Sequence, residues 1–343
     1  MKAVLRVDAS AAIGSGHLSR CLTLARGLAS RGFAITVATR TPEGPMLQWI
    51  EREGHSVVRM SASDIAEDVE ASRLAAEGAS LVVIDGYAFG AAFHEALRAE
   101  GRVVCVVDDL ADAPVRGDAV LNGNLYAEEL AYDVRDGARL LLGPKYALIR
   151  GEIVSARQRR LARPDAKHKT RLLVTMGGAD PTAETDKALA ALDRIDVPLD
   201  VRVIVGGANT RLDAIRERAS KVAARHDVDV RFDVRAMGEE MAWCDVALAA
   251  SGSTCLELAC VGVAAVLIVV ADNQRLVGDA AARRGLMTNL GPHRVVDAPA
   301  IAKAITELAS DPARRRAMED AQRAVVDGEG CTRAATDLAA LAR

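Results

Sequence analysis

Short apolar runs rich in valine, isoleucine and leucine recur along the chain and alternate with segments of helical periodicity. In the first half these runs are KAVLRVD, AITVAT, SVVRM, LVVID and RVVCVVDD. They lack polar alternation, so both faces of each strand should be buried, as in a parallel sheet covered by helices. Leu18 to Ser30, which follows the first run, has apolar residues at helical spacing. The pattern predicts a doubly wound α/β domain.

The same alternation restarts in the second half, in the runs RLLVTMGGADP, VRVIVGG, VDVRFDV, DVALAASGST and AAVLIVVADNQ. Three helical segments then close the chain, the last being Cys331 to Leu341. Between the two series lies the basic stretch Ser155 to Thr170, SARQRRLARPDAKHKT. We interpret it as a solvated linker between domains, with a basic patch that faces phosphate as the alternative. A chain of 343 residues thus fits two α/β domains of similar size, at ~100–200 residues per domain.

Composition narrows the classes of partner. Hydrophobic residues make up 50% of the chain, which excludes wholesale disorder, whereas aromatic residues make up only 3% and the net charge is −3. The low aromatic content and the slightly negative net charge both argue against a nucleic-acid binder and against stable membrane association. The apolar stretch Leu258 to Ala271 is shorter than a membrane span of ~18–20 residues, and Gly262 divides it into a helix end and a strand. The six cysteines show no C-x-x-C spacing and no signal peptide precedes the first strand, so we expect a soluble, cytoplasmic protein with reduced, buried thiols.

The loop after the first strand, IGSGHLS, places two glycines and a histidine before a helix. Gly14 and Gly16 would let a ligand approach the backbone, and the start of the helix offers free N–H groups. His17 could cap the helix or act as a general base, since imidazole has an unperturbed pKa of about 6.5. A dinucleotide fingerprint fits poorly because Ser19 stands at its third glycine position. An NADP site, in which Arg40 would face a 2′-phosphate, is kept as an alternative.

Two loops of the second half, MGGADP and ASGSTCLE, also follow apolar strands, and the latter leads straight into a helix. Backbone and hydroxyl groups at the start of that helix could donate to a pyrophosphate. They belong to Ser251, Gly252, Ser253 and Thr254. Glu257 lies about one turn into the helix, where it could bind a ribose diol or take part in a capping arrangement.

Other motifs are missing from the sequence. No G-x-x-x-x-G-K-[ST] is present, which argues against a P-loop NTPase, and no H-E-x-x-H or clustered Cys/His pattern suggests a metal. Asp108 and Asp109 end a predicted strand, where we expect a solvated strand end, with Mg²⁺ binding as the alternative. We therefore expect neither a metal nor a cofactor.

Seven short motifs occur along the chain in a specific order. Together they resemble those of the UDP-2,4-diacetamido-2,4,6-trideoxy-β-L-altropyranose hydrolase family of pseudaminic acid biosynthesis. That family is itself similar to the GT-B glycosyltransferase that makes lipid II. In chain order the motifs are GSGHLSR, VIDGY, LNGNLYA, GPKYALIR, MGGAD, SGSTCLEL and ADNQ. The resemblance spans most of the chain. One departure is that the family often has Asp-His-Tyr where this chain has Asp85, Gly86 and Tyr87.

The resemblance implies a GT-B fold, in which two doubly wound Rossmann-like domains face an interdomain cleft. Residues 1–157 would form the N-terminal catalytic domain, with the last helix, about 328–343, packing back on it. Residues 158–327 would form the C-terminal UDP-binding domain.

The resemblance also implies roles for individual residues. His17 matches the catalytic base, and Glu257 matches the acid that binds the ribose. The residues expected to bind UDP are, besides Glu257, Gly177, Gly178, Ser251, Gly252, Ser253 and Thr254. The residues expected to contact the sugar are Gly14, Ser15, Gly16, Arg20, Tyr87, Asn124, Tyr146, Asn273 and Gln274.

The expected reaction is metal-independent hydrolysis of a UDP-linked 2,4-diacetamido-2,4,6-trideoxyhexose to free sugar and UDP, with inversion at C1, in the synthesis of pseudaminic acid for flagellin or surface glycans. A nucleoside diphosphate leaves readily, so a single base could suffice. We expect His17 in that role, with Asp8 as its orienting partner. One alternative is a GT-B glycosyltransferase that passes a UDP-amino sugar to an acceptor. Another is a sensor that binds the nucleotide sugar without turning it over.

Overall fold

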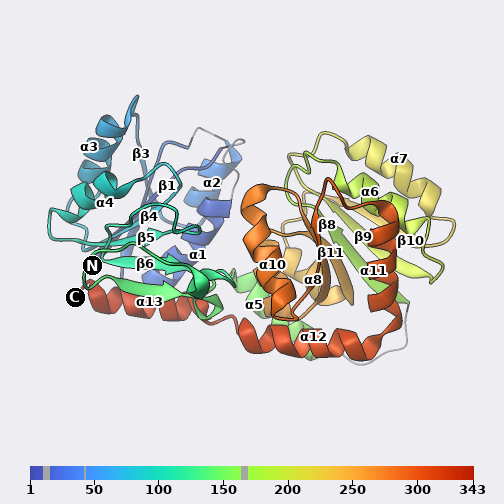
Figure 1. Cartoon of the computed structure of the whole chain (residues 1–343). Coiled ribbons are helices and arrows are strands. Elements are labelled where there is room, and N and C mark those ends of the chain that lie inside the picture. Colours follow the sequence, from blue (N-terminus) through green and yellow to red (C-terminus); the bar gives the residue numbers. More distant parts are fainter. Residues whose placement is uncertain (11–15, 42–43, 164–168) are drawn as a thin grey trace. The chain divides into compact units, whose positions relative to one another are not determined.

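The computed structural model describes residues 1–10, 16–41, 44–163 and 169–343. The chain forms two compact units, each built on one sheet (Figure 1). Unit 1 comprises Met1–Arg150 together with Gly328–Arg343, and unit 2 comprises Gly151–Asp327. The sheet of unit 1 has seven strands and that of unit 2 has six, and neighbouring strands pair in parallel in both. The prediction of two parallel α/β folds is confirmed.

In unit 1, helices cover both faces of the sheet. Its strands, in spatial order, are β3 (Ser56–Arg59), β2 (Ala34–Thr39), β1 (Lys2–Val7), β4 (Leu81–Asp85), β5 (Val103–Val107), β6 (Ala119–Asn122) and β7 (Arg139–Leu142). Its helical elements are α1 (Gly16–Ala29), α2 (Pro45–Arg52), α3 (Ile65–Ala75), α4 (Ala91–Arg98), η1 (Ala127–Glu129), η2 (Pro144–Tyr146) and α13 (Gly330–Leu341). Residues of α1, α2 and α13 pack on one face, and residues of α3 and α4 pack on the other. Burial on both faces explains why the central strands are apolar throughout.

Unit 2 repeats this plan. Its strands, in spatial order, are β10 (Asp227–Phe232), β9 (Leu199–Val205), β8 (Thr170–Thr175), β11 (Val246–Ala250), β12 (Ala264–Val269) and β13 (Thr288–Pro292). Its helical elements are α5 (Gly151–Leu161), α6 (Glu184–Leu192), α7 (Leu212–Val222), α8 (Met237–Trp243), α9 (Thr254–Val261), η3 (Asp272–Gln274), α10 (Arg275–Arg283), α11 (Ala298–Ser310) and α12 (Pro312–Val325). Residues of α6, α7 and α11 share one core with the sheet, while α8 and α9 contact β8 and β11.

The expected break within the longest apolar stretch is confirmed. α9 ends at Val261, Gly262 takes a left-handed conformation with φ 78°, and β12 begins at Ala264. None of the helices in the described ranges combines the length and apolar character that a bilayer-spanning helix needs. All six cysteines are free thiols, and all except the half-buried Cys331 are buried.

The expected linker between Ser155 and Thr170 is wrong for much of its length, because α5 extends to Leu161. Arg157 and Arg160 of this stretch serve as internal anchors of unit 2. Arg157 Nη1 donates to the carbonyl of Cys260 at 2.8 Å. Arg160 donates to the carbonyl of Cys244 and is almost completely buried. From a sequence alone, arginines are expected on the surface. Here the guanidinium groups donate to carbonyl groups at the ends of other helices, which explains the error. Residues 164–168 of this stretch lie outside the described residues.

The last helix, α13, belongs to unit 1 although it follows the whole of unit 2 in the chain (Figure 1). It packs on α1 and η2. Arg31, just beyond α1, donates to the carbonyl of Thr332 at 2.8 Å. The hydroxyl of Tyr146 donates to Asp337 at 2.8 Å. Both polar bonds reinforce the apolar contact between α13 and the core of unit 1.

Each sheet has one topological switch point, where the strand order reverses. In unit 1 the chain runs outward from β1 to β3 and then returns to place β4 beside β1. In unit 2 it runs outward from β8 to β10 and returns to place β11 beside β8. Ligands of open α/β sheets bind beyond the carboxyl ends of the strands at this point. Ligand-binding loops are therefore expected after β1 and β4 in unit 1, and after β8 and β11 in unit 2.

Candidate functional site

His17, in the first turn of α1, points its Nδ1 atom at a buried carboxylate. The distance from His17 Nδ1 to Asp85 Oδ1 is 2.6 Å, and Asp85 is the last residue of β4. An ionised carboxylate only accepts hydrogen bonds, so Nδ1 carries the proton and Nε2 presents a lone pair. Within the described ranges, no group hydrogen-bonds to Nε2. The ring is thus held by a carboxylate outside its own helix, with Nε2 directed away from that carboxylate.

Arg20, one turn further along α1, links Asp85 to a second carboxylate. Its Nε and Nη2 atoms donate to the two oxygens of Asp85, both at 2.6 Å. Its Nη1 atom donates to both oxygens of Asp109, at 2.8 Å each. Asp109 follows β5, the neighbour of β4 in the sheet, so the acids reach one edge from adjacent strands. His17, Asp85, Arg20 and Asp109 are called the charged cluster below.

Asp85 is ionised at any ordinary pH. Its side chain is completely shielded from solvent, and burial by itself would raise its pKa. The charge and hydrogen bonds of Arg20, together with the hydrogen bond from His17, outweigh burial and lower the pKa of Asp85 to about 2. Burial and the Asp85 charge raise the pKa of the Cys21 thiol, which also contacts this carboxylate, so Cys21 stays neutral.

Asp8, the orienting partner expected from the sequence, does not pair with His17. Its carboxylate accepts from Arg6 Nη1 at 2.6 Å and from the backbone N–H of Arg40 at 2.7 Å. The reason is the alternation of side chains along a strand. Asp85 is in register with Val7, on the face that carries α1, whereas Asp8 shares the opposite face with Arg6. The assignment of Asp8 is therefore wrong, and Asp85 takes its place.

Arg40 is committed to the same group of acids. Its Nε atom lies 3.2 Å from Asp8 Oδ2 and 3.4 Å from Asp68 Oδ2. These contacts leave the alternative of an NADP phosphate at Arg40 without support.

Of the residues expected to contact a sugar, Tyr87 and Asn124 join Arg20 at the charged cluster. Asn124 Nδ2 donates to Asp109 Oδ1 at 2.8 Å, and the Tyr87 hydroxyl donates to Asp109 Oδ2 at 3.3 Å. The Tyr87 ring stands edge-on to His17 with centroids 4.9 Å apart, although 60% of the residue is exposed. An exposed aromatic ring beside a base provides a surface on which a sugar could pack.

The other expected sugar contacts have different placements. Gly16 opens α1, and a Cβ atom there would meet nothing within 4 Å. The Tyr146 hydroxyl bonds to Asp337 of α13, so the structure does not bring it into the cluster. Gly14 and Ser15 lie outside the described residues.

The backbone conformation and the space at Gly86 explain why a histidine is absent between Asp85 and Tyr87. Its φ of 154° is one that residues with side chains rarely adopt, and a Cβ atom would lie 2.9 Å from the Phe89 ring. Phe89 cannot easily move, because it packs on Phe93 and under the guanidinium of Arg6, each 4.6 Å from its ring centroid.

Asp108 and Asp109 do not form the solvated strand end that the sequence favoured. Asp108 Oδ1 accepts the backbone N–H groups of Leu110 and Ala111 and so folds the turn. Asp109 is held by Arg20, whose guanidinium lies where Mg²⁺ would have to bind. Among the described residues, no group of His, Cys, Asp and Glu side chains could hold a metal ion.

In unit 2, the N-terminus of α9 presents unused donors at the switch point. Ser253 is the N-cap residue, but its side chain makes no capping hydrogen bond. The backbone N–H groups of Ser253 and Thr254 donate no backbone hydrogen bond within the described part of the chain. Glu257 is the fourth residue of α9, one position beyond the N3 place of a capping box. Such an N-terminus can bind an anion.

The Gly177–Gly178 loop after β8 lies against the next loop of the sheet. A Cβ atom at Gly206 would collide with the backbone of Gly178 and lie 2.6 Å from the Gly177 carbonyl oxygen. Asp180 closes the loop, because its carboxylate accepts the N–H groups of Glu184 and Thr185 at the start of α6. The N-terminus of α6 is therefore occupied, while that of α9 is open.

Ser251 and Gln274 tie the α9 loop to the loop after β12. Ser251 Oγ donates to the Gln274 carbonyl at 3.2 Å, and Gln274 Oε1 accepts the Val270 N–H at 3.2 Å. A Cβ atom at Gly252 would meet the Gln274 side chain at 3.5 Å. Gln274 thus shapes this loop, and Asn273 beside it is exposed.

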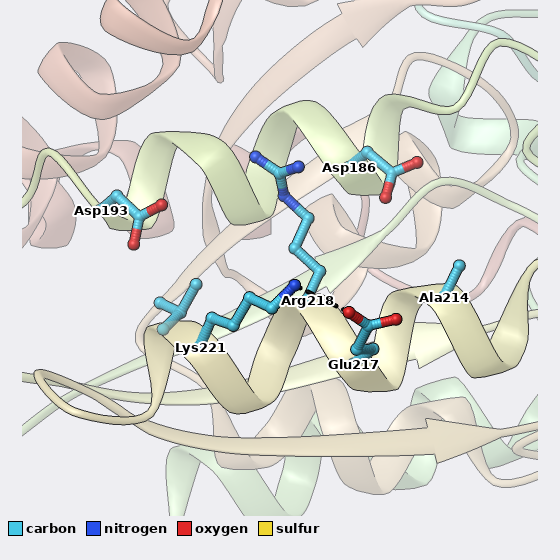
Figure 2. A pocket seen from close by; sticks show the side chains of 7 residues that line it. Asp186, Asp193, Ala214, Glu217, Arg218 and Lys221 are labelled. Atoms are coloured by element: carbon cyan, nitrogen blue, oxygen red, sulfur yellow. Dashed lines mark hydrogen bonds and ion pairs between the residues drawn. The ribbon is translucent and has the colours of Figure 1, made fainter.

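A surface groove of about 340 Å³ lies elsewhere in unit 2, between α6 and α7 (Figure 2). Asp186 and Asp193 line one side, and Glu217, Arg218 and Lys221 line the other. None of the residues expected to act on a substrate lines this groove, and Lys221 pairs with Glu217 across one turn of α7.

Sequence comparison finds distant relatives. Uncharacterized protein MJ1062 of Methanocaldococcus jannaschii is 23% identical over 85% of this chain and 60% of its own length. Spore coat polysaccharide biosynthesis protein SpsG of Bacillus subtilis is 24% identical over 93% and 92%. The UDP-2,4-diacetamido-2,4,6-trideoxy-beta-L-altropyranose hydrolase of Campylobacter jejuni is 29% identical over 52% and 61%. The chain thus spans about three fifths of the length of the first and third relatives. No protein-family profile matches the chain.

Solved structures resemble the whole chain. MurG of Acinetobacter baumannii superposes with a TM-score of 0.74 at 15% identity, over 99% of this chain and 100% of that one. The spinosyn forosaminyltransferase SpnP superposes with a TM-score of 0.70 at 14% identity, over 100% and 99%. At such identities the likeness concerns the fold alone. The chain therefore has the GT-B fold, with a Rossmann-like domain in each unit.

Proposed function

We propose that this protein hydrolyses a UDP-linked 2,4-diacetamido-2,4,6-trideoxyhexose to UDP and the free sugar, with inversion at C1. Unit 2 would hold the nucleotide, and unit 1 would supply the base that activates water. The product would be a precursor of pseudaminic acid for flagellin or surface glycans.

The observation that carries this proposal is the 2.6 Å contact between His17 Nδ1 and Asp85. It directs the lone pair of His17 Nε2 away from the carboxylate, as a general base requires. The base would take a proton from water as the water oxygen forms a bond to C1. At the same time the C1–O bond to the diphosphate breaks, and its electron pair leaves with UDP. Attack opposite the leaving group inverts the anomeric carbon.

The leaving group explains why one base would be enough. Glycosidases protonate an alcohol leaving group with a carboxylic acid. A nucleoside diphosphate carries its charge without such help, and donors at a helix N-terminus can stabilise the charge further. The open N-terminus of α9, with Ser253 and Thr254, suits the diphosphate, while Glu257 would bind the ribose and Gly177 and Gly178 would line the nucleotide site.

The relatives support the same chemistry. The Campylobacter jejuni relative is named for hydrolysis of a UDP-linked diacetamido sugar, and SpsG is named for polysaccharide biosynthesis. An enzyme that processes a sugar nucleotide fits both names and the GT-B fold.

The test is an NMR time course of the protein with the UDP-sugar alone. We expect UDP and free sugar in equal amounts, with the inverted anomer formed first. His17→Asn should slow UDP release by ~100- to 10,000-fold, with little change in UDP affinity. His55→Asn, the same substitution outside the cluster, is the matched control. Full turnover in His17→Asn would remove His17 from the proposed role.

A glycosyltransferase is the second candidate, because one of the solved structures reported above is a transferase by title. Such an enzyme would leave the UDP-sugar largely intact until an acceptor is added. Release of UDP that requires an acceptor would therefore replace hydrolysis with transfer, and His17 would then deprotonate the acceptor hydroxyl.

A further inference from the structure

The carboxylate of Asp109 lies one guanidinium away from the base and its partner. We propose that Asp109 is a positioning residue that sets the proton affinity of His17 by holding the far side of Arg20. The proposal rests on the proposed function in taking His17 as the base, but its test requires no turnover.

The geometry of Arg20 makes the coupling direct. The planar guanidinium gives one edge, Nε and Nη2, to Asp85 and its remaining nitrogen, Nη1, to Asp109. Because the fork is rigid, a change at one carboxylate changes the contact with the other. Arg20 Nη2 also lies 3.1 Å from His17 Nδ1. The guanidinium charge that Asp109 helps to balance therefore lies beside the imidazole ring.

Asp109 is itself held in place. The side chains of Asn124 and Tyr87 donate to its carboxylate, and the Tyr126 hydroxyl donates to its carbonyl at 3.0 Å. Its side chain is 13% exposed. These bonds fix the carboxylate where it can hold Arg20, as expected of a residue that positions another.

The charges explain the effect on His17. With a neutral imidazole, the two carboxylates and the one guanidinium leave the cluster with one excess negative charge. A proton taken up by His17 cancels that charge. The charged or titratable groups of the described residues in contact with the ring or with its carboxylate partner are Asp85 of β4, Arg20 and Cys21 of α1, and Tyr87 of the following loop. Asp109 is the next charge beyond them.

Loss of the Asp109 charge should therefore make protonation of His17 harder. Without the Asp109 carboxylate, Asp85 alone would balance the positive charge of Arg20, and the cluster with a neutral imidazole would carry no excess negative charge. Both changes make the protonated imidazole less favourable. We expect the titration midpoint of the His17 ring to fall by about half a pH unit or more, a threefold loss of proton affinity.

The experiment titrates the imidazole rings of the ligand-free full chain by long-range ¹H–¹⁵N NMR, with His17→Asn to assign the signal. The variants are Asp109→Asn and Asp109→Ser, which remove the charge with different shapes. The matched control is Asp108→Asn, which removes the neighbouring charge, and whose Oδ1 can still accept the turn N–H groups. The expected result is a lower midpoint in both Asp109 variants, an almost unchanged one in the control, and recovery toward the native midpoint in Asp109→Glu.

Two outcomes would overturn the proposal. One is a midpoint in the Asp109 variants that equals that of Asp108→Asn. The other is failure of both charge-removing variants to fold, which would make Asp109 a structural residue. The acid limb of kcat/KM gives an independent check of the proposed function. If the midpoint shifts but that limb does not follow it, His17 is not the base, while the coupling through Arg20 stands.

Discussion

The switch points of the two units have the same topology and opposite chemistry. At β1 and β4 of unit 1, two carboxylates, a guanidinium and an imidazole form one partly buried network around Asp85. At β8 and β11 of unit 2, the corresponding loops offer glycines, hydroxyl groups and free backbone N–H groups. A network of paired charges suits proton transfer, because it holds an imidazole in one tautomer. A helix N-terminus with open backbone donors, as at α9, suits an anion.

The two helices that begin at the switch point of unit 2 sharpen this contrast. Asp180 fills the N-terminus of α6 with its own carboxylate, and the first turn of that helix is acidic. Among the residues that the structure describes, no side chain caps α9 in this way. Of the N-termini of α6 and α9, that of α9 is therefore the one at which an anion such as a diphosphate could bind.

The largest expected effect comes from Asp85→Asn, which keeps the shape of the side chain but removes its charge. His17 then faces an amide that can donate as well as accept, so its tautomer is no longer fixed and turnover should fall by ~100- to 10,000-fold. Calorimetric titration with UDP should give the native affinity, because the substitution lies in unit 1. Asp112→Asn, an exposed acid of the same unit, is the control. Native turnover, or a changed UDP affinity, would break the proposed division of labour between the units.

The pH dependence of stability should distinguish the units as well. Burial lowers the pKa of His94 in unit 1 to about 4, against an ordinary value of 6.5. Between these values the unfolded chain binds more protons, so the stability of unit 1 is fully present above pH 6.5 and falls by about 3 kcal/mol as the pH drops to 4. Asp85, whose pKa is lowered to about 2, should cost a further ~2 kcal/mol between pH 4 and 2.

Trp49 in unit 1 and Trp243 in unit 2 allow the two transitions to be followed separately. Denaturant unfolding of Trp243→Phe reports unit 1, and that of Trp49→Phe reports unit 2. His94→Asn should flatten the slope between pH 6.5 and 4 for unit 1 and leave that of unit 2 unchanged. An unaltered slope for unit 1 would mean that His94 does not carry the acid sensitivity.

The smallest expected effect is that of Thr254→Val in unit 2. Loss of one hydroxyl donor to a charged ligand should weaken UDP binding by about 1–2 kcal/mol, roughly a five- to thirtyfold change. Turnover at saturating substrate should stay close to native. Thr306→Val, which removes a half-buried hydroxyl from α11, should change neither quantity. Native UDP affinity in Thr254→Val would move the diphosphate away from the start of α9.

The sequence predicted the central strands but missed three at the margins. β6 has only four residues, the last two of which begin the LNGNLYA motif, and β7 and β13 are edge strands that are only partly buried. Edge strands do not need apolar residues on both faces, so their sequences lack the continuous pattern that identifies a central strand. β13 also contains Gly291 and Pro292, which read as a turn.

The place of His17 at the switch point was predictable from the sequence, but its carboxylate partner was not. His17 stands out because of the glycine loop around it. Asp8 was expected as the partner because it follows β1 directly, whereas Asp85 comes from a strand that is distant in sequence. The signal that could have helped was the alternation along β1. Val7 points to the face that carries α1, so Asp8 must point to the opposite face. That Asp85 pairs in register with Val7 is tertiary information.

The return of α13 to unit 1 has a consequence for how the protein is made. A ribosome synthesises all of unit 2 before it reaches Gly330–Leu341, the segment whose Ala334, Ala335 and Leu338 complete the core against α1. The nascent first unit must wait, with that apolar face uncovered, until translation reaches the final turns. A chain that stops early would leave this surface open to chaperones and to aggregation, even with unit 2 already folded.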